Sequence, residues 1–263
     1  MKDSLVKVIC FSPTGSSRKI AEVIAGTINP NYNVIDLTLP RERENIQPLF
    51  TDELVILAAP VYFGRVEATA AKVFATLNAN RTPVVLLAVY GNRHFDDALA
   101  EMADITVSRG FTPIAAGAFI AAHSFDSPAH PIAAGRPDAE DLAKARIFGA
   151  AIAEKLSKTT NPQLPDILSV PGNRPCRDYG RIPVTPESSE ACIRCGVCVT
   201  ICPVAAITSK EQTIATDSTC IFCHACVKAC PQKARSCSAP KMLESYQRMS
   251  ALLTERRQPQ WFI

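Results

Sequence analysis

Apolar residues along the first 157 positions follow two alternating patterns. Short runs rich in β-branched residues predict buried β-strands, and longer stretches with apolar residues three and four positions apart predict amphipathic helices. The predicted strands cover residues 5–11, 33–37, 53–59, 83–89 and 112–121, and the predicted helices cover residues 17–28, 67–77, 95–109 and 139–156. This alternation is typical of an α/β domain, residues 1–157, with a doubly wound five-stranded parallel sheet covered by helices.

One connection departs from the alternation. Residues 37–52, between the second and third predicted strands, contain two prolines and show poor periodicity. Their helix is therefore expected to be short or missing.

The pattern changes after residue 157. Residues 158–190 contain six prolines and predict an extended linker, part of which we expect to be ordered along one of the domains. Residues 191–237 form a second, small α+β domain with a predicted β-hairpin that turns at residues 209–212. Residues 238–263 are a tail, with a helix over 240–256 that places Met242, Tyr246 and Met249 or Leu253 on one side.

Charge and composition narrow the function classes. Residues 1–157 carry 15 Lys and Arg against 17 Asp and Glu, and residues 158–263 carry 13 against 8. The basic residues are scattered, so the excess favours docking of an acidic redox partner protein over nucleic-acid binding. The longest uncharged stretch, 110–125, is shorter than the ~20 residues of a spanning helix. With no signal-like apolar run and only Cys10 among the first 175 residues, we expect a soluble, cytoplasmic protein in a reducing compartment.

Eight of the eleven cysteines repeat one spacing: three cysteines two residues apart, then a fourth three residues later that is followed by proline. This spacing binds 4Fe-4S clusters, and the fourth cysteine of each copy reaches across to the other cluster. The predicted ligand sets are Cys192, Cys195, Cys198 and Cys230 for one cluster, and Cys220, Cys223, Cys226 and Cys202 for the other. Zinc is the alternative, but a zinc site needs neither the third cysteine of each run nor the complete second copy.

The turn after the first predicted strand is rich in hydroxyl groups and leads directly into a helix. A helix N-terminus offers unpaired N–H groups and a partial positive charge, which suit a phosphate. The predicted phosphate-binding residues are Ser12, Thr14, Gly15, Ser16 and Ser17. An ordinary capped helix is the alternative, since serine and threonine are common N-cap residues.

Two further loops at the carboxyl ends of predicted strands carry aromatic side chains. Ligands of doubly wound sheets bind at this edge, so these loops suit a flat ring held between them. The predicted ring-binding residues are Pro60, Tyr62, Phe63 and Gly64 in one loop, and Tyr90, Gly91, Asn92, Arg93 and Phe95 in the other.

Taken together, the chain resembles the flavodoxin–ferredoxin fusion proteins of anaerobic prokaryotes. The resemblance covers nearly the whole chain, through FSPTGSSRKIAE, AAPVYFGRVEATA, AVYGNRHFDDALAEM and GAFIAAHSF in the first domain and the doubled cysteine motif in the second. It implies a flavodoxin-like first domain that binds FMN at Ser12, Thr14, Gly15 and Ser17, and a bacterial-type ferredoxin domain with two 4Fe-4S clusters. The loops at 60–65 and 90–95 depart from the usual flavodoxin sequences, and His224 stands where a glycine is usual.

Three functions fit this reading. The leading one is electron transfer between the clusters and FMN, because clusters handle single electrons and a flavin accepts one or two. The second is an FMN-dependent reductase of a quinone or another small acceptor, and the third is a docking or redox-sensing module without flavin. Arg65 and Arg93 are expected to flank the flavin ring, where a cation would favour two-electron reduction unless Asp96 and Asp97 neutralise it.

The remaining cysteines and histidines have weaker assignments. Cys10 is expected to be a buried small apolar residue, and Cys176 and Cys237 are expected to be structural. His94 and His123 are predicted to be polar loop residues, with proton relay as the alternative. His224 is predicted to be a solvated bystander, with a tuning role beside its cluster as the alternative.

Overall fold

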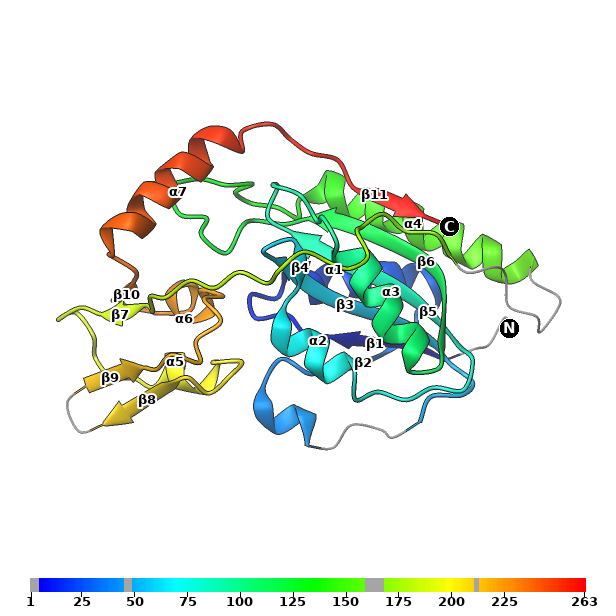
Figure 1. The fold of residues 1–263 in the computed structure, drawn as a ribbon, viewed down its shortest axis with the longest axis horizontal. Coiled ribbons are helices and arrows are strands. Elements are labelled where there is room, and N and C mark those ends of the chain that lie inside the picture. Colours follow the sequence, from blue (N-terminus) through cyan, green and yellow to red (C-terminus); the bar gives the residue numbers. More distant parts are fainter. Residues whose placement is uncertain (1–4, 45–48, 159–167, 211–212) are drawn as a thin grey trace.

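The computed structural model describes residues 5–44, 49–158, 168–210 and 213–263, and Figure 1 shows its fold. Five parallel strands form the main sheet in the order β2-β1-β3-β5-β6, which is the flavodoxin-like order of doubly wound folds. The predicted fold class is thus confirmed. The strands are β1 (Val6–Cys10), β2 (Asn33–Asp36), β3 (Leu54–Tyr62), β5 (Thr82–Tyr90) and β6 (Phe111–Ile120), and the short β4 (Arg65–Val66) pairs with the end of β3.

Helices cover both faces of this sheet. Helices α1 (Ser16–Ile28) and α4 (Ala139–Lys158) bury Ile20, Ile24 and Phe148 against one face. Helices α2 (Ala68–Phe74) and α3 (Ala98–Ser108) pack on the other face, in front of the sheet in Figure 1. The expected helix between β2 and β3 is reduced to a 3-10 turn, η1 (Pro40–Arg43).

A sixth strand was missed by the sequence analysis. Strand β11 (Gln260–Phe262) lies antiparallel to β6 at the edge of the main sheet. Its Trp261 stacks on Phe119 and Phe148, with ring centroids 6.4 Å and 5.8 Å away. The end of the predicted tail is therefore part of the first domain's sheet. Three residues are too few to show strand periodicity in the sequence.

The described part of the linker, residues 168–190, lies along the first domain. Leu168 and Val170 pack against the core on the α3 face. The N–H groups of Asn173 and Arg177 each donate to the carboxylate of Asp97, at 2.8 Å. The linker thus follows the edge of α3 before it reaches the second domain.

The second domain consists of short elements around the cysteines. Strands β7 (Glu187–Ser188) and β10 (Arg235–Ser236) pair with each other, and β8 (Ile207–Lys210) and β9 (Thr213–Thr216) form the predicted hairpin, whose turn at 211–212 lies outside the described residues. The single-turn helices α5 (Val197–Thr200) and α6 (Ala225–Lys228) each contain the third cysteine of their motif, Cys198 and Cys226. Helix α7 (Pro240–Leu252) then runs from this domain back toward the main sheet (Figure 1).

None of the helices in the described part of the chain has the length and apolar character that crossing a membrane requires.

Candidate functional site

A cavity of about 340 Å³ lies at the carboxyl ends of β1, β3, β5 and β6. Ligands of doubly wound sheets bind at this edge. The cavity brings together eleven of the fourteen residues predicted to hold the flavin: Ser12, Thr14, Ser16, Ser17, Pro60, Tyr62, Phe63, Gly64, Tyr90, Gly91 and Arg93.

The turn after β1 presents hydrogen-bond donors to the cavity. Gly15 precedes α1 with φ of 81°, a left-handed conformation that glycine adopts without a steric penalty. The N–H of Arg18 donates to Ser12 Oγ at 3.1 Å, whereas the N–H groups of Ser16 and Ser17 have no acceptor within the described chain. Two unpaired N–H groups at the start of a 13-residue helix can bind a phosphate.

Three predicted binding residues lie outside the cavity lining: Gly15, Asn92 and Phe95. Gly15 shapes the turn through its backbone. Phe95 is buried beneath the loop, where its ring stacks on His94 at 4.9 Å and lies 5.8 Å from that of Tyr90. Asn92 points its amide at the C-terminal segment, as described below.

The two loop arginines have different surroundings. Arg65 donates to Glu101 from Nε at 2.8 Å and from Nη2 at 2.6 Å, and it does not line the cavity. The expectation that Arg65 flanks the ring is therefore wrong, because Glu101 holds its side chain at α3. Arg93 does line the cavity, but it forms an ion pair with Asp96. No carboxylate occurs among the described lining residues, so the cavity wall suits an anionic ligand.

Two histidines lie at the mouth of the cavity. Burial, assisted by the nearby charge of Lys228, lowers the pKa of His123 to about 4. The imidazole of His123 is therefore neutral at pH 7. His94 also lines the cavity, and its Nδ1 accepts the N–H of Asp96 at 2.9 Å.

The outer wall of the cavity comes from parts of the chain that sequence reasoning did not connect with the flavin. Ile221 and Phe222, between the first two cysteines of the second motif, reach the cavity, and Ile182 of the linker lies beside them. Helix α7 contributes Met242, Ser245 and Met249. The helical spacing of Met242 and Met249 predicts that they lie on one side of a helix. It does not predict that this side faces the cavity.

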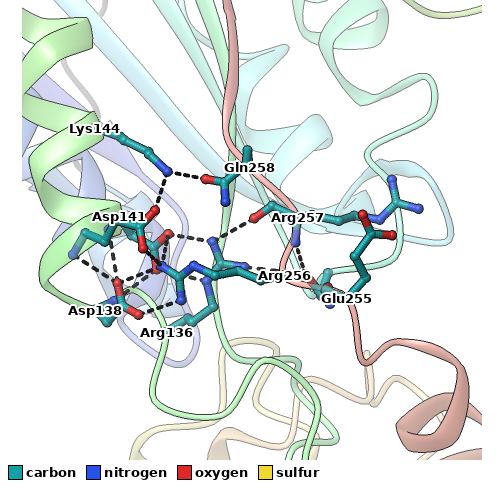
Figure 2. Close-up of polar contacts among 10 residues, drawn as sticks. Arg136, Asp138, Asp141, Lys144, Glu255, Arg256, Arg257 and Gln258 are labelled. Carbon is teal, nitrogen blue, oxygen red and sulfur yellow. Dashed lines mark hydrogen bonds and ion pairs between the residues drawn. The ribbon is translucent and has the colours of Figure 1, made fainter.

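A polar network fastens the segment after α7 to the first domain, and we call residues 253–258 the clasp (Figure 2). Asn92 Nδ2 donates to the carbonyl oxygens of Leu253 at 3.0 Å and Glu255 at 2.8 Å. The buried Arg136 donates to both oxygens of Asp141, and its Nη2 also donates to the carbonyl of Arg257 at 3.0 Å.

Exposed ion pairs extend the clasp. Arg256 donates to both carboxylate oxygens of Asp138, at 2.7 Å and 3.0 Å. Lys144 of α4 contacts Gln258, as Figure 2 shows. The clasp and β11 together hold α7 at the cavity. Asn92, predicted to touch the flavin, is thus engaged with the backbone of the clasp.

An aromatic cluster joins the two domains beside the cavity. Phe125, in the loop after β6, packs against Phe222 at 5.4 Å, His224 at 5.1 Å and Tyr246 at 5.0 Å between ring centroids. His224 is only 6% exposed, and its Nε2 lies 3.3 Å from the hydroxyl of Tyr246. The prediction of a solvated His224 is therefore wrong, because α7 and Phe125 cover it.

Four cysteines line a second, small cavity: Cys192, Cys195, Cys198 and Cys230. These residues form one of the predicted crossed ligand sets. Gly196, with φ of 77°, lets the chain turn between the second and third cysteines of this run. Cys195 is exposed, and neighbouring Ile193 is 61% exposed, so this cavity faces the solvent.

The other four cysteines lie deeper. Cys202 packs with Cys220 and Cys226 in the domain core, where Cys198 of the first set also lies, and Cys223 is within electrostatic reach of Cys202, Cys220 and Cys226. Cys202, Cys223 and Cys226 are each at most 8% exposed. Burial raises the pKa of the Cys223 and Cys226 thiols, so ionised sulfur here requires a positive partner such as iron.

The donor set fits iron–sulfur clusters. Thiolate sulfur is the usual ligand of such clusters, and each of the two sets supplies four cysteines. Arg235 also lines the solvent-facing cavity and is buried without a carboxylate partner in the described chain. A buried cation of this kind is compatible with an anionic group at the site.

The three remaining cysteines lie outside these sets. Cys10 is fully buried at the end of β1, as expected of a small apolar residue. Cys237 is buried in the cluster that contains Phe222 and Tyr246. Cys176 is partly buried in the linker.

Residues 191–234 match a family described as the 4Fe-4S dicluster domain. A search of curated proteins found no match.

Solved structures similar to this chain include a flavodoxin from the domain Archaea, 16% identical, with 59% of this chain and 99% of that chain covered and a TM-score of 0.41. A Fusobacterium nucleatum flavodoxin bound to flavin mononucleotide is 12% identical, over 57% of this chain and 98% of that chain, with a TM-score of 0.39. A Bacillus anthracis azoreductase is 13% identical, over 58% and 99%, with a TM-score of 0.36.

The strand order and the family match together show how the chain is organised. It joins a flavodoxin-like α/β domain to a ferredoxin-type segment, residues 191–234, that matches the 4Fe-4S dicluster domain.

Proposed function

We propose that this protein transfers electrons between two 4Fe-4S clusters and an FMN held in the larger cavity. One observation carries the proposal: the phosphate-type turn of the first domain and residues 221–222 of the second cysteine motif line the same cavity. A ligand that fills this cavity contacts a loop next to Cys220 and Cys223, so the two redox groups would be neighbours.

The chain's residues divide the work of holding FMN. The N–H groups of Ser16 and Ser17 and the hydroxyls of Thr14 and Ser17 would bind the phosphate. The aromatic side chains of Tyr62 and Tyr90 would border the ring. FMN, when bound, supplies the capacity to take up one or two electrons, whereas each cluster takes up one.

The different burial of the two cysteine sets supports a direction of transfer. We call the set of Cys192, Cys195, Cys198 and Cys230 the outer set, and the set of Cys220, Cys223, Cys226 and Cys202 the inner set. The outer set is open to solvent at Cys195, where a redox partner protein can approach. The inner set adjoins the cavity through Phe222, so electrons from a partner would pass through both clusters before the flavin.

The reductase alternative receives less support. The sequence favoured it because two arginines were expected beside the flavin. In the structure, Arg65 lies outside the cavity and Arg93 is paired with Asp96. A paired arginine contributes little net positive charge to the ring. We therefore propose a carrier of electrons between protein partners.

Anaerobic purification and cofactor analysis test the proposal. We expect about eight irons and one FMN per chain. Thr14→Ala combined with Ser17→Ala removes two hydroxyl donors to the phosphate and should weaken FMN binding by on the order of 3 kcal/mol, roughly 100-fold.

The matched control is riboflavin, which has no phosphate and should bind the variant and the wild type equally. Zinc in place of iron would contradict the cluster assignment. An iron-loaded protein without affinity for FMN would favour the docking or redox-sensing alternative.

A further inference from the structure

Arg235 is buried in the second domain without a negative partner. Its exposed fraction is 3%, and the oxygen atoms to which its side chain donates are all neutral. These are Ser188 Oγ at 3.1 Å, the Pro186 carbonyl at 2.9 Å and Thr216 Oγ1 at 2.7 Å. Its Nε has no hydrogen-bond partner in the described structure.

A second buried arginine shows the usual arrangement. Arg136 is as deeply buried but forms an ion pair with Asp141 through two hydrogen bonds. Because an unpaired buried charge costs several kcal/mol, a guanidinium like that of Arg235 requires a nearby anion. None of the ion pairs found among the described residues involves Arg235.

The position of Arg235 shows where such an anion belongs. Arg235 lines the solvent-facing cavity together with Cys192, Cys195, Cys198 and Cys230. Its Nη2 also lies 3.9 Å from Sγ of Cys226, which belongs to the inner set. The guanidinium therefore lies between the two sets of sulfur ligands.

The linker fixes this position. Arg235 is in β10, opposite Ser188 of β7, and the linker residues Pro186 and Ser188 both accept from it. Thr216 of β9 accepts from the same Nη2 as Pro186. Three residues from two segments thus hold the charge in place, as expected for a group with a defined electrostatic role.

We propose that Arg235 is a shared counter-cation of both clusters, a positioning residue that stabilises their reduced forms and so raises both reduction potentials. This inference rests on the proposed function, because it requires that the two cysteine sets hold clusters. Reduction adds one negative charge to a cluster, and a fixed cation in a buried site favours the more negative form. A cation between the two sites acts on both.

The test measures the midpoint potential of each cluster by anaerobic redox titration with electron paramagnetic resonance. Arg235→Gln keeps hydrogen-bonding groups but removes the charge, and we expect both potentials to shift downward. Arg235→Lys keeps the charge, so both of its potentials should stay close to those of the wild type. Lys210→Gln, which removes an exposed charge from β8 in the same domain, is the matched control and should leave both potentials unchanged.

A second variant covers the case in which Arg235→Gln does not assemble its clusters. Ser188→Asp leaves the arginine in place and puts a carboxylate next to its Nη1, so it neutralises the charge without removing the side chain. Both potentials should again move downward. Unchanged potentials in Ser188→Asp, or a shift confined to one cluster, would overturn the shared role. A wild-type protein without two clusters would instead contradict the proposed function, and the iron count distinguishes these results.

Discussion

At the scale of single residues, burial sets the charge of groups that the sequence leaves ambiguous. His123 looks like an ordinary loop histidine in the sequence, yet its surroundings keep it neutral. Burial lowers its pKa to about 4, and the charges of Lys228 and Arg93 and the nearby His224 act in the same direction. His123 therefore adds no positive charge to the cavity mouth down to mildly acidic pH.

This state of His123 predicts a pH dependence of stability. The unfolded chain binds a proton at His123 near pH 6.5, while the folded chain does so only near pH 4. The free energy of unfolding should therefore be highest above about pH 6.5 and fall as the pH decreases toward 4, by up to about 3 kcal/mol from this group.

Denaturant unfolding of the iron-loaded protein between pH 5 and pH 7.5 measures the effect. His123→Gln should show a shallower decline than the wild type, since only this histidine is removed. Parallel pH profiles of the two proteins would mean that His123 remains solvated.

At the scale of secondary-structure elements, the clasp and β11 decide where α7 lies. Helix α7 begins at the second domain and supplies Met242, Ser245 and Met249 to the cavity. Its position depends on Tyr246, which packs against Phe125, and on contacts after its own last residue, from Asn92 to the clasp and from β6 to β11. The wall of the cavity is thus held by both domains.

Asn92→Gly should loosen this wall. Asn92 has φ of 63°, which glycine adopts easily, so the variant removes three hydrogen bonds to the clasp, those with Leu253, Glu255 and the N–H of Arg257, without straining the loop. We expect a loss of about 1–3 kcal/mol in the local stability of α7 and the clasp.

Hydrogen exchange of the iron-loaded protein measures this loss. Amides in residues 240–262 should exchange roughly tenfold faster or more, whereas amides in β1 and β3 should be unchanged. Arg174→Gln, which removes the exposed ion pair with Asp104, serves as the control. Equal protection of α7 in Asn92→Gly and the wild type would show that the clasp does not hold the helix.

At the scale of the whole molecule, the two cysteine sets form a sequence from solvent to cavity. If ligands cross between the motifs, Cys202→Ser removes the inner cluster and Cys230→Ser removes the outer one. The cluster that remains in Cys202→Ser is then the exposed one. It should lose iron to a water-soluble chelator several-fold faster than the cluster remaining in Cys230→Ser.

Before the chelator is added, both variants should contain about four irons per chain. The comparison is then between one remaining cluster in each variant. Absorbance of the iron–chelator complex then gives the rates under anaerobic conditions. The reverse order of rates would mean that each motif binds its own cluster without crossing.

Local sequence patterns predict most of this architecture. Periodicity identifies the five parallel strands and their helices, because each depends on residues close together in the chain. Cysteine spacing also identifies Cys192, Cys195, Cys198 and Cys230, which line one cavity in the structure. The placement of Phe222 and Met249 at the cavity and the burial of His224 were not predictable in this way, since they depend on how the domains pack. Asn92 was misassigned for the same reason.

The position of β11 also sets the order in which the molecule can be completed during synthesis. The ribosome makes β6 well before residues 260–262, and at ~5–20 residues per second the interval is roughly ten seconds. Until then the edge of β6 lacks its partner and can pair with other chains. The first domain, although encoded first, reaches its final sheet only after both cysteine motifs have been made.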